Sequence, residues 1–518
     1  MNGAQAMVRT LVDCGVDVCF ANPGTSEMHF VAALDTVPEM RGVLSLFEGV
    51  ATGAADGYAR MSERPAATLL HLGPGLGNGL ANLHNARKAR VPLVNVVGDH
   101  ATYHKRYDAQ LESDIDTVAR NVSTWIRRAA RTEDLAADAA DAVAAAEGPP
   151  GQVATLILPA DVSWSEGGLP AAKRQAMRRS PVATDAVDGV ARLLRSGEPA
   201  ALLLGGAALR ERGLVAAARI AAECGTRVLC ETFPTRLERG AGVPAVDRLA
   251  YLAEFAAAQL DGLRHLVLVD ARAPVSFFAY PGKQSYLVPD GCAVTVLVDG
   301  TGDAAGTLEA LADAVDAAPT AAAVQPAATP VRPTGALTAD TVGQALGALM
   351  PEGAIVSDEA NTSGLFLVAP TAGAPRHDWL TLTGGAIGQG LPLAIGAAVA
   401  CRDRRVIALE ADGSALYTFQ ALWTMAREGL DVTTILLNNR SYAVLRMELN
   451  RVGAQAAGTK AGDMLDLTRP DMDFVSMATG LGVPASRATT ADDFTIQLEA
   501  SLGEPGPHLI EAVVPSIF

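Results

Sequence analysis

Positive charge is scarce in this sequence. Its 518 residues carry 41 Lys and Arg against 57 Asp and Glu, a formal net charge of −16. Proteins that bind nucleic acid present a basic surface to the phosphates, so this balance argues against that class. Charged residues make up only 19% of the chain and 49% is hydrophobic, which excludes an intrinsically disordered protein. The length predicts about three domains.

Long apolar runs are also missing. No stretch approaches the roughly 20 apolar residues of a membrane span, and Arg9 and Asp13 interrupt the N-terminal segment where a signal peptide needs an apolar core. The six cysteines include no Cys-x-x-Cys pair, so we expect neither a disulfide framework nor a zinc site. These absences favour a soluble, cytoplasmic protein with no membrane partner.

What the chain does have is a regular alternation of short β-rich runs and Ala-rich amphipathic stretches. The β-rich runs end in Gly, Asp or Asn and lie at 67–73, 92–99, 200–206, 263–270, 404–412 and 432–439. This pattern is typical of βαβ units whose parallel sheets are buried on both faces. Two connectors without apolar periodicity, 165–181 and 317–335, divide the chain into three predicted α/β domains. The predicted domains are 1–165, 180–318 and 335–518.

Polar residues in the last third follow two successive predicted strands. Asp412 ends one strand and Asn439 follows the next, with a predicted helix between them. Because parallel strands end at the same edge of a sheet, both side chains are delivered to one crevice. Asp412, Asn439 and the Ser441 carbonyl offer the oxygen ligands that Mg²⁺ prefers, and the N–H groups of Gly413 and Ser414 favour an anion. The pattern predicts a Mg²⁺–diphosphate site, unless the two motifs are an ordinary turn and an ordinary loop.

The stretch 410–442 resembles the thiamine diphosphate (ThDP) motif of the acetolactate synthase, pyruvate oxidase and benzoylformate decarboxylase superfamily. That motif is Gly-Asp-Gly-Ser followed, after a helix and a strand, by Asn-Asn. Ala411 stands here in place of the first Gly, and we expect its methyl group to crowd the turn without loss of the site. The resemblance implies three Mg²⁺ ligands: Asp412, Asn439 and the Ser441 carbonyl.

A second motif in the first third carries an acid. FEGVATGAADGYAR, at 47–60, matches the family pattern Glu-Gly/Ala-x-x-x-Gly-x-Ala-Asp-Gly-Tyr-Ala. The resemblance places Glu48 where relatives have the acid that bonds the cofactor's pyrimidine nitrogen and promotes its imino tautomer. The alternative is that Glu48 is only a helix-start acid favoured by the helix dipole.

Motifs on either side of Glu48 resemble the same family. NPGTSEMHF, at 22–30, resembles its early Pro-Gly loop, which approaches the cofactor through Asn22, Pro23, Gly24 and Thr25. HLGPGLGNGLANLHNA, at 71–86, resembles its Gly-Pro-Gly loop, and benzoylformate decarboxylase also has a histidine near the position of His71. His71 either donates protons near the reacting carbon or is a buried structural histidine.

Two segments of the last third resemble further cofactor contacts. In TLTGGAIGQGLPLAIGAAVA, at 381–400, the resemblance implies that the Gly385 carbonyl accepts from the pyrimidine amine and that Ile387 wedges between the cofactor's two rings. In SDEANTSG, at 357–364, it places Asn361 and Thr362 against the diphosphate.

The middle segment and the substrate-selecting residues match neither acetolactate synthase nor benzoylformate decarboxylase fully. VDARAPVSFF, at 269–278, replaces the Arg-Phe-Asp-Asp-Arg segment of FAD-containing acetolactate synthases, so FAD is in doubt. The middle-domain histidine of benzoylformate decarboxylase is Ala279 here. In the loop 98–115, Gln110 stands where acetolactate synthases have Phe, which weakens the synthase interpretation. His100, His104 and Gln110 are candidate substrate residues, and the two histidines either bind a carboxylate or relay protons, or merely line a polar loop.

The resemblance spans essentially the whole chain. It implies an α/β fold of three doubly wound parallel-sheet domains: an N-terminal pyrimidine-binding (PYR) domain, a central Rossmann-like domain and a C-terminal diphosphate-binding (PP) domain. It implies a homodimer or homotetramer with active sites between subunits. The implied function is ThDP- and Mg²⁺-dependent decarboxylation of pyruvate or a related 2-oxo acid, with acetolactate synthase-like condensation onto a second carbonyl. Two alternatives remain open, a non-condensing lyase resembling benzoylformate decarboxylase and a catalytically weak ThDP-binding regulatory paralogue.

Overall fold

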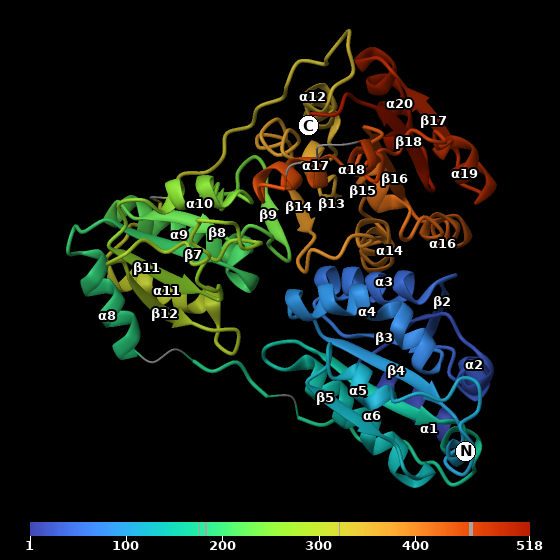
Figure 1. The fold of residues 1–518 in the computed structure, drawn as a ribbon. Helices are drawn as coiled ribbons and strands as arrows, with labels where there is room; N and C mark the ends of the chain where they lie inside the picture. The colour runs from blue at the N-terminus through green and yellow to red at the C-terminus, as the bar shows by residue number, and fades with distance from the viewer. Residues whose placement is uncertain (176, 182–183, 321, 455–458, 518) are drawn as a thin grey trace.

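Strands form where the sequence has short, continuous apolar runs. The structure is a computed structural model that describes residues 1–175, 177–181, 184–320, 322–454 and 459–517. In it, strands such as β3 (Ala66–Leu70) and β4 (Leu93–Asp99) are buried along their whole length. Strands covered by helices on both faces need no polar alternation, which explains these runs. Figure 1 shows three lobes that follow one another in chain order.

The first lobe is a parallel sheet with the strand order β2-β1-β3-β4-β6-β5. Its other strands are β1 (Val18–Ala21), β2 (Arg41–Leu44), β5 (Trp125–Arg128) and β6 (Val153–Pro159). The elements around the sheet are α1 (Gly3–Asp13), η1 (Thr25–Glu27), α2 (Met28–Thr36), α3 (Glu48–Ser62), α4 (Leu72–Ala89), η2 (Lys105–Tyr107), α5 (Ile115–Ala119), α6 (Thr132–Glu147) and α7 (Ala160–Trp164).

The second lobe is a smaller parallel sheet with the order β10-β8-β7-β11-β12. Its strands are β7 (Ala200–Leu204), β8 (Arg227–Cys230), β10 (Asp247–Arg248), β11 (His265–Val269) and β12 (Ala293–Val298). Its helices are α8 (Thr184–Leu194), η3 (Gly206–Leu209), α9 (Glu211–Cys224), α10 (Ala253–Leu260) and α11 (Ala304–Ala314).

The third lobe has the order β17-β18-β16-β15-β13-β14-β9. Its strands are β13 (Ala354–Glu359), β14 (His377–Thr381), β15 (Val406–Ala411), β16 (Val432–Asn438), β17 (Ala485–Ala488) and β18 (His508–Val513). Its helices are α12 (Ala339–Leu349), α13 (Asn361–Gly364), α14 (Gly390–Ala400), α15 (Asp412–Ala415), α16 (Ala421–Glu428), α17 (Ala443–Arg451), α18 (Thr459–Asp463), α19 (Phe474–Gly480) and α20 (Ala491–Gly503).

The α/β fold class is confirmed, with one feature that the sequence did not indicate. Strand β9 (Leu237–Arg239) comes from the middle of the chain, yet it pairs antiparallel with β14 of the third sheet. The middle segment is therefore attached to the third lobe by backbone hydrogen bonds. No helix in the described ranges is both long and apolar enough to cross a membrane.

Helices α3 and α14 bring the first and third lobes into contact (Figure 1). A Cβ atom at Gly57 would collide with the Leu393 carbonyl oxygen, and one at Gly396 would collide with the Ala54 carbonyl oxygen. Backbone meets backbone at both points, so only glycine fits. The apolar core around this crossing contains residues from both lobes, including Val50 of α3 and Ile395 of α14.

A buried arginine connects all three lobes. The Arg60 guanidinium donates to both carboxylate oxygens of Asp56, at 2.8 and 2.7 Å, and both side chains are fully buried. It also donates to the carbonyl oxygen of Thr235, in the middle segment, at 3.1 Å and to that of Thr381, in β14, at 2.8 Å. A buried charge is stable only when it is paired and hydrogen-bonded, so these contacts restrict how the lobes can sit together.

We expect Arg60→Met to lower the free energy of unfolding by about 3–5 kcal/mol, because Asp56 would keep a buried charge without its ionic partner. Urea unfolding followed by circular dichroism measures this. Arg64→Met is the matched control, because Arg64 pairs with Asp17 at 3.2 Å with the two side chains 52% and 43% exposed. Such surface pairs contribute at most about 1 kcal/mol. Equal losses in the two variants would contradict the role given to Arg60.

Candidate active site

The predicted diphosphate-binding residues lie where β13, β15 and β16 end, at one edge of the third sheet. Asp412 directly follows β15, and its two carboxylate oxygens accept from the backbone N–H groups of Gly413, at 2.8 Å, and Arg440, at 2.6 Å. The turn after β16 is therefore folded onto Asp412. Within that turn, the Asn439 side-chain oxygen accepts from the Ser441 N–H at 3.0 Å.

Asp412 is buried, which makes its charged form less stable. Burial raises the pKa of Asp412 to about 6, although nearby backbone N–H groups act in the opposite direction. A positive ion beside this carboxylate would stabilise its charged form. Among the described residues there is no cluster of three or more His, Cys, Asp or Glu arranged to hold a metal. The predicted ligand set differs from such a cluster, because it combines one carboxylate with an amide and a carbonyl.

The residues around Asp412 form a close-fitting turn. Asn361 has a left-handed backbone (φ +50), and its side-chain amide donates to the Ser414 hydroxyl at 2.8 Å. A Cβ atom at Gly413 would collide with the Tyr442 ring, so glycine is required there. The backbone at Ala411 is extended (φ −91), a conformation open to any residue, so the family's glycine is not needed at this position.

One cavity of about 1290 Å³ is lined by every last-third residue that the sequence assigned to the cofactor. These residues are Asn361, Thr362, Gly385, Ile387, Asp412, Gly413, Ser414, Asn439 and Ser441. Gly385 has φ +74 and lies directly under the ring of Phe277, a residue of the middle segment. The structure thus brings together segments that are separated by tens of residues in the chain.

Sequence reasoning missed two buried acids, Glu359 on the wall of this cavity and Glu410 beside it. Glu359 accepts from the N–H groups of Gly388 and Gly390, at 2.7 and 2.5 Å, and Glu410 is its neighbour on the adjacent strand. Burial raises the pKa of Glu359 to about 7, and burial together with the charge of Glu359 raises the pKa of Glu410 well above its usual range. Glu410 therefore holds a proton beside the Glu359 carboxylate. The only signal in the sequence was an acid at the end of each of two apolar strands.

The predicted acid of the first lobe lies at the corresponding edge of the first sheet. Glu48 begins α3 and is 5% exposed, and His71 is the residue just before α4. The Asn78 amide donates to one Glu48 oxygen at 3.0 Å. The other Glu48 oxygen lies next to Gly75, which is also next to His71. The structure therefore brings Glu48 and His71 close to each other.

Glu27 is a second residue that the sequence did not single out. One of its carboxylate oxygens contacts His71 Nδ1 at 2.8 Å and accepts from the Gly24 N–H at 2.7 Å. Burial raises the pKa of Glu27, whereas the contacts with His71 and Gly24 lower it. A carboxylate at Nδ1 keeps the ring proton on that nitrogen and leaves Nε2 for other contacts. Glu27 lies within the 22–30 motif, but nothing in that motif links it to His71.

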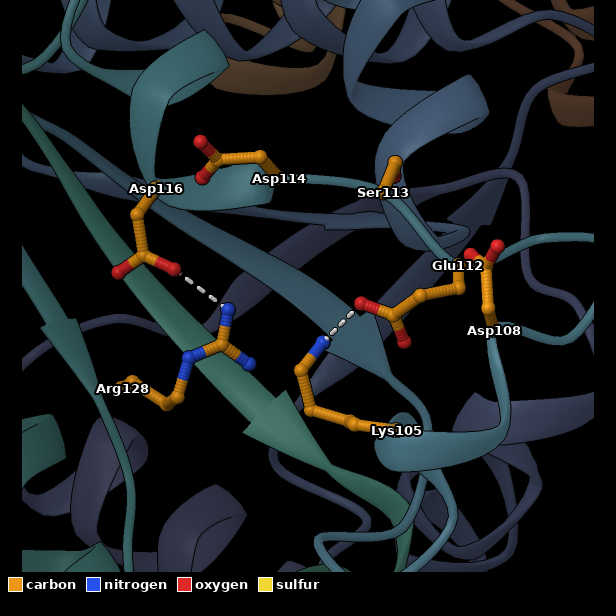
Figure 2. A pocket seen from close by; sticks show the side chains of 7 residues that line it. All are labelled: Lys105, Asp108, Glu112, Ser113, Asp114, Asp116 and Arg128. Carbon is orange, nitrogen blue, oxygen red and sulfur yellow. Dashed lines mark hydrogen bonds and ion pairs between the residues drawn. The ribbon is translucent and has the colours of Figure 1, made fainter.

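Of the candidate substrate residues, His100 and His104 lie next to each other, whereas Gln110 is exposed. The rings of His100 and His104 lie 5.3 Å apart, and His100 Nε2 is buried without a hydrogen-bond partner among the described residues. Gln110 is exposed in the turn that follows. Figure 2 shows the neighbouring pocket of about 410 Å³, where Lys105 pairs with Glu112 and Arg128 with Asp116. Both cations are neutralised by acids, so this loop offers no unpaired Lys or Arg in that pocket.

The first-third candidate residues do not line the large cavity. All of the residues that line the 1290 Å³ cavity lie between 232 and 464. The first-third candidates therefore contribute nothing to its wall; they are Asn22, Pro23, Gly24, Thr25, Glu48, His71, His100, His104 and Gln110. A ligand in this cavity would touch only part of the predicted site of its own chain.

Comparison with protein families identifies the fold's relatives. Residues 1–120 match the N-terminal TPP binding domain of thiamine pyrophosphate enzymes, and residues 368–512 match the C-terminal TPP binding domain. The chain is 64% identical, over the full length of both proteins, to the Mycobacterium tuberculosis protein named "Putative acetolactate synthase large subunit IlvX". The chain belongs to the thiamine pyrophosphate enzyme family.

Two further relatives of this thiamine pyrophosphate enzyme are named as decarboxylases. Benzoylformate decarboxylase of Pseudomonas aeruginosa is 30% identical, with 97% of each chain covered. The solved structure of the ThDP-dependent 4-hydroxybenzoylformate decarboxylase of Rhodococcus jostii RHA1 is similar with a TM-score of 0.86 at 26% identity, with 99% of each chain covered. The resemblance inferred from the motifs is confirmed, and so is the three-sheet fold.

We expect Glu27→Gln to move ring protons of His71 from Nδ1 to Nε2, because a neutral amide no longer provides the negative charge that favours Nδ1–H. Ring-nitrogen NMR on ¹⁵N-histidine-labelled protein measures this, with His71→Gln to assign the signal. Glu39→Gln is the control, since Glu39 pairs with Arg9 at the surface. Unchanged His71 shifts in Glu27→Gln would contradict the pairing.

Proposed function

We propose that this thiamine pyrophosphate enzyme is a Mg²⁺-dependent 2-oxo acid decarboxylase with acetolactate synthase-like carboligase activity. The observation that carries the proposal is the single cavity lined by both Asp412, with its Asn439–Ser441 turn, and the Gly385–Ile387 segment. The buried Asp412 carboxylate, with Asn439 and Ser441 on the same cavity wall, offers oxygen ligands that suit a metal–diphosphate group. The name of the relative that is 64% identical supports the synthase type.

In this proposal the last-third residues hold the cofactor. Asp412, Asn439 and the Ser441 carbonyl would hold Mg²⁺, while Asn361, Thr362, Gly413 and Ser414 would contact the diphosphate. Gly385 and Ile387 would contact the two rings. ThDP supplies the electron sink that carbon dioxide release from a 2-oxo acid requires, and the protein supplies binding, orientation and exclusion of water.

The first-third residues would handle protons. Glu48, with one oxygen already accepting from Asn78, would hold a proton at the cofactor's pyrimidine nitrogen through the other oxygen. His71 would exchange protons near the reacting carbon through Nε2, since Glu27 occupies Nδ1. Asn22, Pro23, Gly24 and Thr25 would approach the cofactor beside them, and His100, His104 and Gln110 would contact the substrate.

We further propose that the active site forms between two copies of the chain, in a homodimer or homotetramer. The cavity wall lacks every first-third candidate residue, which supports a site completed by the PYR domain of a second chain. The proposed domains are PYR at 1–165, central at 180–318 and PP at 335–518. The boundary positions are those predicted from the connectors.

A non-condensing lyase for aryl 2-oxo acids is the second candidate function. The favouring observation is a cluster of aromatic rings on the cavity wall, in which Phe277 contacts Phe233, Tyr251 and Phe278 with ring centroids 5.7, 5.3 and 4.9 Å apart. Aromatic side chains pack well against an aryl group. The names of the two decarboxylase relatives support the same class.

A screen for carbon dioxide release from 2-oxo acids, with products identified, tests the proposal. With ThDP and Mg²⁺ we expect turnover of pyruvate and formation of an acetolactate-type product, whereas release from phenylglyoxylate with the aldehyde alone identifies the lyase. Asp412→Asn should lose at least about 100-fold in activity, because the metal loses its only charged ligand from the protein. The exposed Asp403→Asn is the control and should keep full activity. Cofactor binding without release from any 2-oxo acid would leave only a regulatory paralogue.

Mixing two inactive variants tests the intersubunit site. Glu48→Gln damages the PYR side and Asp412→Asn the PP side, so a heterodimer retains one site built from two intact halves. We expect the co-expressed mixture to regain roughly a quarter of wild-type turnover, since half of the dimers are mixed and each has one good site in two. Neither variant alone should be active. No recovery in a mixture shown by mass spectrometry to contain heterodimers would contradict a shared site.

A further inference from the structure

The segment that carries Gly385 and Ile387 is held from outside the PP domain by helix α4 of the same chain. The Asn85 side-chain amide donates to the Ala386 carbonyl oxygen at 2.8 Å, and its oxygen accepts from the Ala386 N–H at 3.2 Å. Asn85 is fully buried. The Asn85 side chain thus hydrogen-bonds both the N–H and the C=O of Ala386, the residue between Gly385 and Ile387.

These two hydrogen bonds from Asn85 determine the direction of the Gly385 carbonyl. The Ala386 N–H and the Gly385 C=O belong to one planar trans peptide and point in opposite directions. Because the N–H is turned toward Asn85, the carbonyl is turned away from it. Gly385 lies on the cavity wall, and its carbonyl oxygen accepts no hydrogen bond from any described residue. An acceptor held in this way is prepared for a donor from a ligand.

The orientation of the Asn85 amide is itself determined by its neighbours. Its NH₂ group donates to the Asn82 oxygen at 2.9 Å as well as to Ala386. Asn82 in turn donates to the Gly49 and Gly388 carbonyl oxygens, at 2.8 and 3.1 Å. A flipped Asn85 amide would set its oxygen against two other oxygens and its NH₂ against the Ala386 N–H. The carbonyl of Gly385 is therefore directed by a chain of buried, satisfied hydrogen bonds.

We propose that Asn85 is a positioning residue for ThDP: by holding the 385–386 peptide it directs the Gly385 carbonyl at the cofactor's 4′-amino group. The inference rests on the proposed function, because it assumes that ThDP occupies this cavity. It assigns to the first third of the chain a role toward the cofactor bound by its own last third. That role differs from the role of Glu48, which acts at the site shared with a second copy.

Binding of ThDP and of its analogue without the 4′-amino group, 4′-deamino-ThDP, tests the proposal without use of activity. The wild-type protein should bind ThDP about tenfold more tightly than the analogue, because only ThDP donates to the Gly385 carbonyl. In Asn85→Ala the ratio of the two dissociation constants, measured by calorimetry with Mg²⁺ present, should fall to about one or two. If Asn85→Ala does not fold, Asn85→Ser leaves a smaller cavity and should show the same loss of discrimination.

Arg41→Gln is the matched control for loosening of the contact between the lobes. Arg41 pairs with Glu428 at 2.6 Å, which joins the first and third lobes away from the 384–390 segment. This variant should keep the wild-type ratio even if its thermal midpoint falls. A wild-type ratio in folded Asn85→Ala or Asn85→Ser would overturn the role of Asn85. A wild-type protein that binds neither ThDP nor the analogue would instead overturn the proposed function.

Discussion

The buried pair of Arg60 and Asp56 is the interaction on which the arrangement of the lobes depends. An enclosed guanidinium is stable only if its N–H groups find acceptors, and here Thr235 and Thr381 supply carbonyl oxygens from other parts of the chain. The crossing of α3 and α14, in which Gly57 lets two backbones touch, brings these acceptors within reach. Since α3 starts at the proposed acid and α14 starts just after the 384–388 segment, the same contact also sets the position of both halves of the site.

Buried carboxylates recur at the site, and each is stabilised by local donors. Asp412 faces backbone N–H groups, Glu27 faces His71 and Gly24, and Glu359 accepts from the segment above it while Glu410 stays protonated. Overall charge has little influence at this scale, because such contacts act over a few ångströms and distant charges are screened by salt. A net charge of −16 therefore does not prevent local N–H groups, such as those around Asp412, from facing a negatively charged group.

The parts of the site that could be predicted came either from the ends of strands or from family motifs. Asp412 and Asn439 could be placed together because each follows a strand of one parallel sheet, and strand ends meet at one edge. Glu48 and His71 could be placed by family motifs. Glu27 and Asn85 could not, because their partners are 44 and 301 residues away in the chain. No local pattern of burial or turn chemistry reports a contact over such a separation.

The sequence by itself determined the α/β class, the succession of three sheets and the residues at the strand ends, because these follow from apolar runs and turn residues that act within a few positions. Only the tertiary structure decided that β9 joins the third sheet, that Glu359 and Glu410 are buried side by side, and that Asn85 reaches across to Ala386. These features depend on which surfaces of separate elements come into contact. That choice is made by close packing and by the need to pair each buried polar group, neither of which is encoded in any single stretch of the chain.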